Sequence, residues 1–421
     1  MTRRVALAVL GAGPIGLEMA LAAAEADIDF VVLEASEAPA GNVRDWGSVR
    51  LFTPWSMNVS PRARARLQES GCVCPDDDQC PTGQELFDLA LEPISRLPEV
   101  VDRVLCGSRV VAVSRDGLLK NDEIGRPTRA SRPFRILFEG PDGEDVLLAD
   151  RVVDCTGTYH NPNSLGSGGI PAPGERGAAA RIVRRIPDLE TEAAIFDGRR
   201  ILLVGGGHSA QTAAVALADR IQERPDTRVT WALRSAEPDF APDPHDLLRA
   251  RSALHAAAQE IVDHGRGIRV LPGRIVERLS SEADGVRVTL QSAPGASGRD
   301  GSDSVIGASE EVEVDVVLAL TGAVGDHTLY RQLQVHECWA TSGPMKLAAS
   351  LLADGSADCM AQTGHGPEVL KNPEPDFYIL GSKSYGRNNS FLLRVGWEQV
   401  EDVISILSAQ QTIAMAGERQ E

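Results

Sequence analysis

The N-terminal part of the chain has two short apolar runs separated by a glycine turn and an alanine-rich stretch. Residues 5–10 are all apolar, and Gly11-Ala12-Gly13-Pro14-Ile15-Gly16 follows directly. Residues 17–26 are rich in Ala and Leu, and the largely apolar run 28–33 ends on Glu34. Short apolar runs bounded by glycine are typical of strands buried on both faces of a parallel sheet. The pattern predicts a strand–helix–strand unit.

The first glycine turn has the spacing of a dinucleotide-binding motif. Gly11 permits the tight turn, Gly13 lets the backbone approach a pyrophosphate, and Gly16 lets the helix pack closely on the strand. The helix N-terminus offers N–H groups to the phosphates. Glu34 lies at the separation of roughly 20 residues at which an acid binds a ribose hydroxyl. The predicted nucleotide contacts are Gly11, Gly13, Pro14, Ile15, Gly16 and Glu34, and a tight turn without further function is the alternative.

A second copy of this unit lies near the middle of the chain. Residues 200–204 are a predicted strand, residues 211–221 a helix, and residues 229–233 a strand that ends on Arg234. An arginine pairs with a 2′-phosphate that a carboxylate would repel, so the second site favours NADPH over NADH unless Arg234 is only a surface residue. His208 either contacts the pyrophosphate or has no role. The predicted contacts are Gly205, Gly207, His208, Ser209, Ala210 and Arg234.

Both glycine turns are followed by the same sequence of predicted strands. In the first half, a strand pair at 110–113 and 134–138 precedes an apolar run that ends in Thr156-Gly157. In the second half, a pair at 275–279 and 286–290 precedes a run that ends in Thr321-Gly322. An internal repeat of a nucleotide-binding unit implies two nucleotide sites.

This arrangement resembles the two-dinucleotide-binding-domain flavoproteins over almost the whole chain. The resemblance implies FAD in the first domain and NADPH in the second, with Thr156 and Gly157 in the FAD site. It implies an α/β fold of two Rossmann-like three-layer domains. The NADP(H)-binding domain, 166–322, would be inserted in an FAD-binding domain of residues 1–165 and 323–421.

Within this superfamily, the chain is most similar to flavin-dependent monooxygenases and amine N-hydroxylases. Gly205-x-Gly207-x-Ser209-Ala210 resembles their second motif, and Trp46 followed by residues 56–60 is similar to a segment near their flavin. The resemblance places Asn58 beside the flavin ring, where an asparagine helps hold the oxygen adduct; without it, Asn58 is equally a turn or capping residue. Residues 372–381 and 390–393 resemble the C-terminal flavin segment of amine N-hydroxylases. The further FAD contacts we expect are Trp46, Arg50, Gly381, Ser390, Phe391 and Leu392.

Three departures from known patterns limit the assignment. The Phe-x-Gly-x-x-x-His-x-x-x-Tyr/Trp motif of flavin-containing monooxygenases is missing before the second glycine turn. Residues 41–58 have no cysteine, which disfavours a dithiol reductase. The pair Gly381-Ser382 stands where many reductases have Gly-Asp, which again favours the monooxygenases.

The predicted function is an NADPH-consuming, FAD-dependent monooxygenase that oxygenates a small nitrogen or sulfur nucleophile with molecular oxygen through a flavin hydroperoxide. Two alternatives stay open: an NAD(P)H-dependent reductase or dehydrogenase without a redox dithiol, and a non-catalytic flavin redox sensor. Lys383 and Arg387 lie in a polar segment that either lines the flavin and substrate pocket or is a solvated loop. His245, His255 and His264 do not recur at a helical spacing that would form a metal face.

Charge and cysteine content narrow the partners and the compartment. The net charge of −18 disfavours binding to nucleic acid or anionic lipid through bulk charge. No apolar stretch approaches the length of a membrane helix. The seven scattered cysteines suit a reducing cytoplasm, and Cys72, Cys74 and Cys80 lack the spacing of a zinc finger, so we expect no metal. A homo-oligomer is left open.

Overall fold

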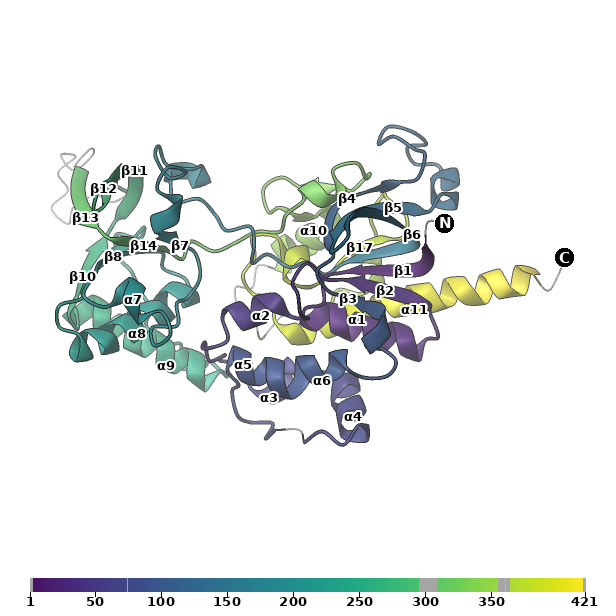
Figure 1. The fold of residues 1–421 in the computed structure, drawn as a ribbon, viewed down its shortest axis with the longest axis horizontal. Coiled ribbons are helices and arrows are strands. Elements are labelled where there is room, and N and C mark those ends of the chain that lie inside the picture. The colour runs from purple at the N-terminus through teal and green to yellow at the C-terminus, as the bar shows by residue number, and fades with distance from the viewer. Residues whose placement is uncertain (1–2, 74, 295–308, 355–359, 361–363, 419–421) are drawn as a thin grey trace. The chain divides into compact units, whose positions relative to one another are not determined.

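The chain folds into two units, which are described separately (Figure 1). The computed structural model describes residues 3–73, 75–294, 309–354, 360 and 364–418. The first unit comprises Met1–Gly47, Thr53–Asn161 and Val324–Glu421, and the second comprises Ser48–Phe52 and Pro162–Ala323. The predicted α/β class is confirmed, since each unit has a parallel sheet with helices packed on it. Apart from Ser48–Phe52, the second unit is an insertion between parts of the first.

The sheet of the first unit has a parallel part and an antiparallel part that share one long strand, β6. The strand order is β3-β2-β1-β6-β5-β4, and β17 pairs with the carboxyl half of β6. Strands β1, β2, β3, β6 and β17 are parallel, whereas β4, β5 and β6 form an antiparallel meander. The strands are β1 (Arg4–Leu10), β2 (Phe30–Leu33), β3 (Val104–Leu105), β4 (Arg109–Arg115), β5 (Phe134–Gly140), β6 (Gly143–Asp154) and β17 (Phe377–Ile379).

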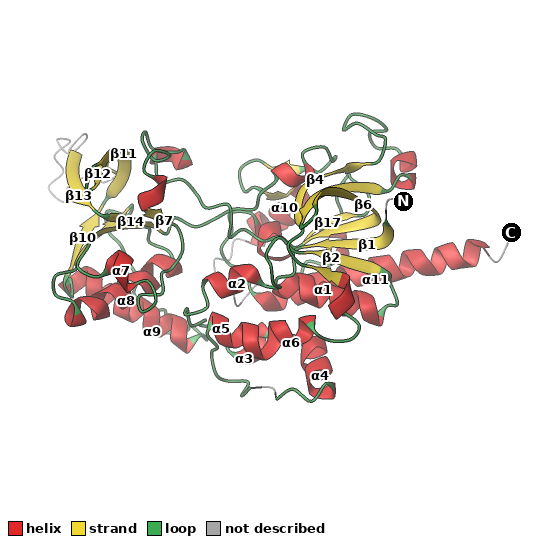
Figure 2. Cartoon of the chain, viewed as in Figure 1, coloured by secondary structure: helices red, strands yellow, loops and turns green. Residues whose placement is uncertain are grey.

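Two helices distant in sequence pack together in the first unit (Figure 2). They are α1 (Pro14–Glu25), which follows the glycine turn, and α11 (Leu393–Glu418), the C-terminal helix of the described residues. A short π-helix at Phe87–Leu91 joins α5 and α6 into one continuous helical segment. The remaining helices are α2 (Gly41–Asp45), α3 (Trp55–Asn58), α4 (Pro61–Glu69), α5 (Gly83–Leu86), α6 (Glu92–Ser95) and α10 (Met345–Asp354), and a short ladder pairs β15 (Glu337–Cys338) with β16 (Gly343–Pro344).

The second unit has three layers, because alternate residues of its parallel strands face opposite sides. Ile201 and Leu203 of β8 pack with helices α8 and α9, whereas Leu202 and Val204 pack with the three-stranded antiparallel sheet. This period of two is that of a strand buried on both faces. The parallel order is β10-β9-β8-β14-β7, and the antiparallel order is β11-β12-β13. The elements are β7 (Ile182–Val183), α7 (Ala193–Phe196), β8 (Arg200–Val204), α8 (His208–Glu223), β9 (Arg228–Leu233), α9 (Arg249–His264), β10 (Ile268–Pro272), β11 (Arg274–Glu282), β12 (Gly285–Ser292), β13 (Ser309–Val314) and β14 (Val316–Ala319).

A buried ion cluster fixes the segment that precedes β17. The Glu374 carboxylate accepts hydrogen bonds from Arg115 Nε (2.7 Å) and Arg129 Nε (3.0 Å), and all three side chains are buried. The backbone N–H of Gln334 donates to the same carboxylate at 2.8 Å. Two guanidinium groups and an amide therefore tie residues 372–376 to β4 and to the segment before β5.

None of the helices within the described ranges combines the length and the apolar character required to cross a membrane.

Candidate functional site

The first glycine turn is closed by backbone contacts that leave no room for a side chain at two positions. Gly11 has φ +92°, and a Cβ there would lie 2.9 Å from the Cys155 carbonyl oxygen. A Cβ on Gly16 would lie 1.9 Å from the Gly11 carbonyl oxygen, so only glycine allows α1 to begin this close to β1. The turn is thus held against the carboxyl end of β6, which carries Cys155 and Thr156.

The same turn is open at Gly13, the residue that caps α1. A Cβ on Gly13 would meet no described atom within 4 Å, and no described side chain caps the helix. Pro14 follows at the first helical position, where its missing N–H costs nothing. The N-terminus of this 12-residue helix therefore presents its dipole and uncapped N–H groups to open space, as a pyrophosphate requires.

Glu34 is buried at the carboxyl end of β2 and holds the turn. Its carboxylate accepts hydrogen bonds from the backbone N–H of Ala12 (2.7 Å) and of Ser36 (2.9 Å). A carboxylate has about four acceptor positions, so two are left for the hydroxyls of a ribose.

The side chain of Ile15 packs inside the first unit. A Cβ on Gly381 would lie 3.4 Å from Ile15 Cγ1, and one on Gly396 of α11 would lie 2.3 Å from Ile15 Cδ1. The predicted cofactor contact of Ile15 is therefore limited to its backbone, while its side chain locks α1 to α11 and to the C-terminal glycine turn.

Thr156 and Gly157 leave β6 above a fully buried ion pair. Lys383 Nζ donates to Asp154 Oδ2 (2.6 Å) and to Thr156 Oγ1 (3.1 Å), and the side chains of Lys383 and Asp154 are both 0% exposed. Asp154 Oδ1 in turn accepts from the Thr156 hydroxyl at 2.7 Å. The expectation that Lys383 lines a flavin or substrate pocket is wrong, because its ammonium group is committed to Asp154 and Thr156.

The C-terminal segment places Gly381, Ser390, Phe391 and Leu392 between β17 and α11. Gly381 has φ +73°, and its N–H donates to Gln399 Oε1 of α11 at 2.8 Å. The Ser390 hydroxyl is buried and has no hydrogen-bond partner among the described residues. Phe391 packs edge-on against Tyr385 at 5.3 Å, and Leu392 is buried. A buried hydroxyl without a protein partner fits a hydrogen bond to a polar group of a bound cofactor.

The three remaining residues that we expected near the flavin have surroundings that differ from one another. They are Trp46, Asn58 and Arg50. The Trp46 ring packs on Gly83, where a Cβ would lie 2.6 Å from Trp46 Cε3. The buried Asn58 amide donates to the carbonyls of Thr53 (2.8 Å) and Pro54 (2.9 Å), and its Oδ1 accepts from the Thr53 hydroxyl (2.9 Å). Both amide N–H groups are thus used within the loop. Arg50 is exposed and lies in the segment grouped with the second unit.

The second glycine turn repeats the geometry of the first. Gly205 has φ +132°, and a Cβ there would lie 2.2 Å from the Leu320 carbonyl oxygen. Trp231 Nε1 donates to the Gly205 carbonyl at 2.8 Å, which fixes the turn on β9. Gly207 caps α8, and a Cβ on it would meet no described atom within 4 Å. The helix begins at His208 rather than at residue 211, so Ser209 and Ala210 belong to its first turn.

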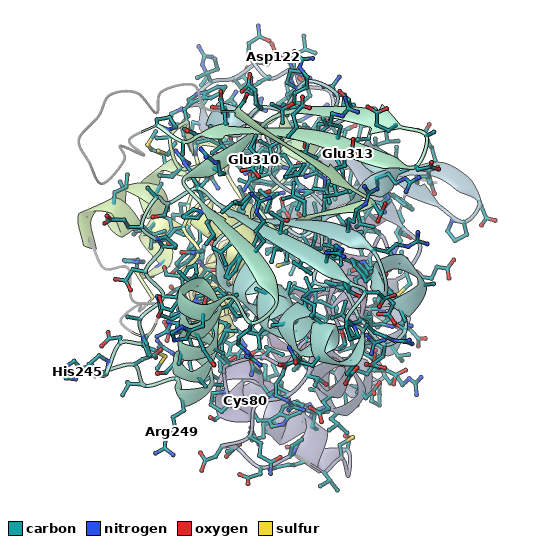
Figure 3. The ribbon with its side chains drawn as sticks, turned by 90° about the vertical axis from the view of Figure 1, so that its left-hand side faces the viewer. Cys80, Asp122, His245, Arg249, Glu310 and Glu313 are labelled. Atoms are coloured by element: carbon teal, nitrogen blue, oxygen red, sulfur yellow. The ribbon has the colours of Figure 1, made fainter. Side chains whose placement is uncertain are left out.

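The sequence singled out His208 at this turn but not its pairing with a second histidine. His208 Nε2 lies 3.2 Å from Nε2 of His255 on α9, and the two rings stack at 10°. Figure 3 shows His245 and Arg249 projecting outward; His245 precedes α9 and is exposed. Arg234 is exposed at the carboxyl end of β9. The spacing of 47 residues between the paired histidines carries no local signal, so only the fold brings them together.

Both turns fit the groups that the sequence predicts. Each has a closed first glycine, an open second glycine and an uncapped helix of at least 12 residues. In the first unit an acid, Glu34, follows β2. In the second unit a cation, Arg234, follows the corresponding strand β9. Both turns therefore have the backbone geometry that a pyrophosphate requires, and the assignment of free ribose hydroxyls to the first and a 2′-phosphate to the second stays a prediction.

Comparison with known proteins gives a structural match only. No protein-family model and no curated protein sequence matches the chain. Bacillithiol disulfide reductase Bdr (YpdA) from Bacillus cereus is similar in structure, with 18% identity, a TM-score of 0.68, and coverage of 97% of this chain and 100% of that one.

Two further structures are similar at the same coverage of this chain, 97%. Kutzneria sp. 744 ornithine N-hydroxylase KtzI, with reduced FAD, NADP⁺ and L-ornithine, has 16% identity, a TM-score of 0.61 and 100% of its chain covered. Thioredoxin reductase from T. acidophilum has 14% identity, a TM-score of 0.59 and 99% of its chain covered. The chain therefore shares its fold with two-dinucleotide-binding-domain structures that include both reductases and an N-hydroxylase.

Proposed function

We propose that the protein is an FAD-dependent, NADPH-consuming monooxygenase that oxygenates a small nitrogen or sulfur nucleophile. FAD, when bound, supplies the hydride acceptor and the centre that activates oxygen. Residues 1–165 and 323–421 would hold FAD through the turn at Gly11–Gly16, Glu34 and Thr156-Gly157. Residues 166–322 would hold NADPH through the turn at Gly205–Ala210 and Arg234. The oxygenation takes place in a reducing, cytoplasmic setting.

The observation that carries oxygenation over disulfide reduction is the state of the cysteines. Residues 41–58 contain none, and Cys72, Cys106, Cys155 and Cys338 form no disulfide within the described part of the chain. Cys155 lies under the first glycine turn, where burial raises its pKa well above the ordinary value. A thiol that resists ionisation is a poor nucleophile, so Cys155 is unsuited to pass electrons from the flavin to a disulfide. We take molecular oxygen to be the acceptor instead.

Asn58 is the residue we assign to the reacting centre. Its hydrogen bonds to Thr53 and Pro54 fix the plane of the amide with protein groups alone. Its Oδ1 accepts one hydrogen bond from the Thr53 hydroxyl and has a second lone pair for another donor. A fixed polar group in a dry site stabilises developing charge at little reorganisation cost. Asn58 would therefore hold a proton-bearing group beside the flavin and keep water from it.

The test is to follow NADPH oxidation, oxygen uptake and product mass with isotopically labelled oxygen in the purified yellow holoenzyme. We expect one labelled oxygen atom in the product for each NADPH oxidised. Asn58→Ser should keep NADPH oxidation but lower product per NADPH about tenfold, since one fixed contact contributes roughly 1–3 kcal/mol. Asn121→Ser, at an exposed position, is the matched control. Unlabelled product, or turnover without oxygen uptake, contradicts the proposal.

A reductase of the same architecture is the second candidate. Two observations favour it: the TM-score of 0.68 with a bacillithiol disulfide reductase, and the use of both Asn58 amide N–H groups inside the loop. It predicts turnover with quinones, dyes or low-molecular-mass disulfides under anaerobic conditions. Bound FAD that NADPH fails to reduce would instead indicate a non-catalytic redox sensor.

A further inference from the structure

The stacked histidines His208 and His255 form a titratable pair at the start of α8. Their Nε2 atoms are 3.2 Å apart, so one ring donates a proton and the other accepts it. This hydrogen bond is possible when both rings are neutral and when one ring is a protonated imidazolium. If both rings were protonated, two N–H groups would face each other and the bond would be lost. The helix start therefore has a built-in switch between neutral and positive charge.

An aromatic ring and an ion pair lie around the two histidines. The Phe52 ring lies 5.1 Å from the His208 ring. Asp246 binds Arg251 of α9 through both oxygens, at 2.8 Å from Nε and 2.7 Å from Nη2. Burial, the neighbouring His255 and Arg251 lower the pKa of His208, and Asp246 opposes them; burial and Arg251 likewise lower the pKa of His255. Before a ligand binds, the pair is thus mainly neutral near pH 7.

A second observation at this turn points to a ligand. Gln211, in the first turn of α8, is 4% exposed, and its Nε2 donates to the Gly206 carbonyl at 3.2 Å. Its Oε1 has no hydrogen-bond partner among the described residues. A buried acceptor placed against the glycine turn requires a donor such as a ribose hydroxyl. Gly207 in the same turn leaves open space.

We propose that the His208–His255 pair takes up one proton when the pyrophosphate of a nicotinamide dinucleotide binds at the second glycine turn, so that dinucleotide affinity depends on pH. The pyrophosphate at the helix start favours the charged imidazole pair, because an anion stabilises a neighbouring cation. His208 is the first residue of the helix and meets the anion, while His255 shares the proton. This inference rests on the dinucleotide site of the proposed function but not on oxygenation.

The sign of the pH dependence follows from linkage. The ligand raises the pKa of the pair, so binding takes up a proton at pH values between the free and the bound pKa. Affinity is therefore greatest below the free pKa and falls as the pH rises through the bound pKa, by up to about tenfold per pH unit for one proton. Above the bound pKa, the affinity no longer changes.

Calorimetry of NADP⁺ binding to the oxidised holoenzyme tests this without hydride transfer. Titrations from pH 5.5 to 8.5, in buffers of different ionisation enthalpy, give the protons taken up for each ligand bound. NAD⁺ is the second ligand, because it has the same pyrophosphate but no 2′-phosphate that titrates in this range. We expect uptake approaching one proton with both ligands.

Histidine variants separate the pair from other groups. His255→Gln and His208→Asn should abolish the uptake and weaken binding about tenfold at low pH, with little change at pH 8.5, where the pair is neutral in all forms. His245→Gln, at an exposed position outside α9, is the matched control and should behave as the wild type. FAD content and far-UV circular dichroism show whether each variant is folded. If one of the two histidine variants fails to fold, the other still tests the role of the pair.

The outcomes distinguish the two proposals. Pyridine nucleotide binding without proton uptake, or uptake that persists in both variants, overturns the role of the pair. Uptake with NADP⁺ but not with NAD⁺ would show that the proton goes to a group that responds to the 2′-phosphate rather than to the pyrophosphate, and would also overturn it. Failure of both nucleotides to bind at any pH overturns the second dinucleotide site together with this inference. Proton-linked binding without oxygenation would leave the pair intact and contradict only the monooxygenase.

Discussion

The two nucleotide turns share a backbone and differ in the side chains around it. In both, the first glycine adopts a positive φ against the end of a parallel strand, and the second faces open space before an uncapped helix. The first turn adds a buried acid, Glu34, whereas the second adds an exposed cation, Arg234, and a histidine pair. Under the proposed function, the shared backbone would provide the pyrophosphate site, and these few side chains would decide which dinucleotide each turn accepts.

The largest expected effect comes from closing either turn with a methyl group. Gly16→Ala should remove FAD and destabilise the first unit by about 3 kcal/mol or more, because its Cβ overlaps the Gly11 carbonyl oxygen. Gly205→Ala should instead abolish NADP⁺ binding and leave FAD bound. Visible absorbance and calorimetry measure the two cofactors.

Gly207→Ala is a control for the fold alone, because its Cβ meets no described atom and its φ is −76°, although Gly207 is itself a predicted nucleotide contact. It should leave the fold unchanged. Loss of FAD from Gly205→Ala to the same extent as from Gly16→Ala would contradict the independence of the two turns.

The next effect concerns the buried Lys383–Asp154 ion pair under the Thr156-Gly157 turn of the first unit. Lys383→Met leaves the Asp154 carboxylate buried without its cation and should lower the free energy of unfolding by about 3–5 kcal/mol. Asp154→Asn combined with Lys383→Met should recover part of this loss. Urea unfolding at pH 7 measures both.

Arg4→Met, which breaks an exposed ion pair with Asp150, is the control and should cost at most about 1 kcal/mol. A loss for Lys383→Met as small as that for Arg4→Met would show that the buried pair does not support the turn.

The smallest effects should come from the side chains that distinguish the two cofactors. Glu34→Gln should weaken FAD by about 1.5–3 kcal/mol, since it loses charge-assisted bonds to the turn and to the ribose. Arg234→Gln should lower the preference for NADPH over NADH by about tenfold or more and leave FAD unchanged. Steady-state kinetics with both nucleotides and FAD titration of the apoprotein measure these changes. An unaltered nucleotide preference would make Arg234 a surface residue.

The elements with the strongest local signals could be predicted from the sequence. The apolar runs at 5–10 and 200–204 correspond to β1 and β8, and the repeated strand pairs correspond to β4–β5 and β11–β12. These are segments in which hydrophobic pattern, glycine and chain order agree. The acid and the cation after the second strand of each unit also lie at the predicted positions.

The contacts that join distant segments could not be predicted. Lys383 reaches Asp154 across 229 residues, and Arg115 reaches Glu374 across 259. Lys383 looked like a loop cation because its neighbours Ser382, Ser384 and Gly386 are polar or small. Its burial follows from the 3₁₀ turn at Gly381–Tyr385, which rotates the side chain inward, and no short-range pattern encodes that rotation.

The pairing of β17 with β6 has a consequence for the order of synthesis. The strand that completes the first unit's sheet, and Lys383 just after it, leave the ribosome only after the whole of the second unit. Pro162–Ala323 can therefore fold as soon as it emerges, whereas residues 3–161 wait with the edge of β6 unpaired. The Glu374 cluster and the Ile15 contact with α11 also form last. Any cofactor bound at the first glycine turn is thus captured by a nearly finished chain.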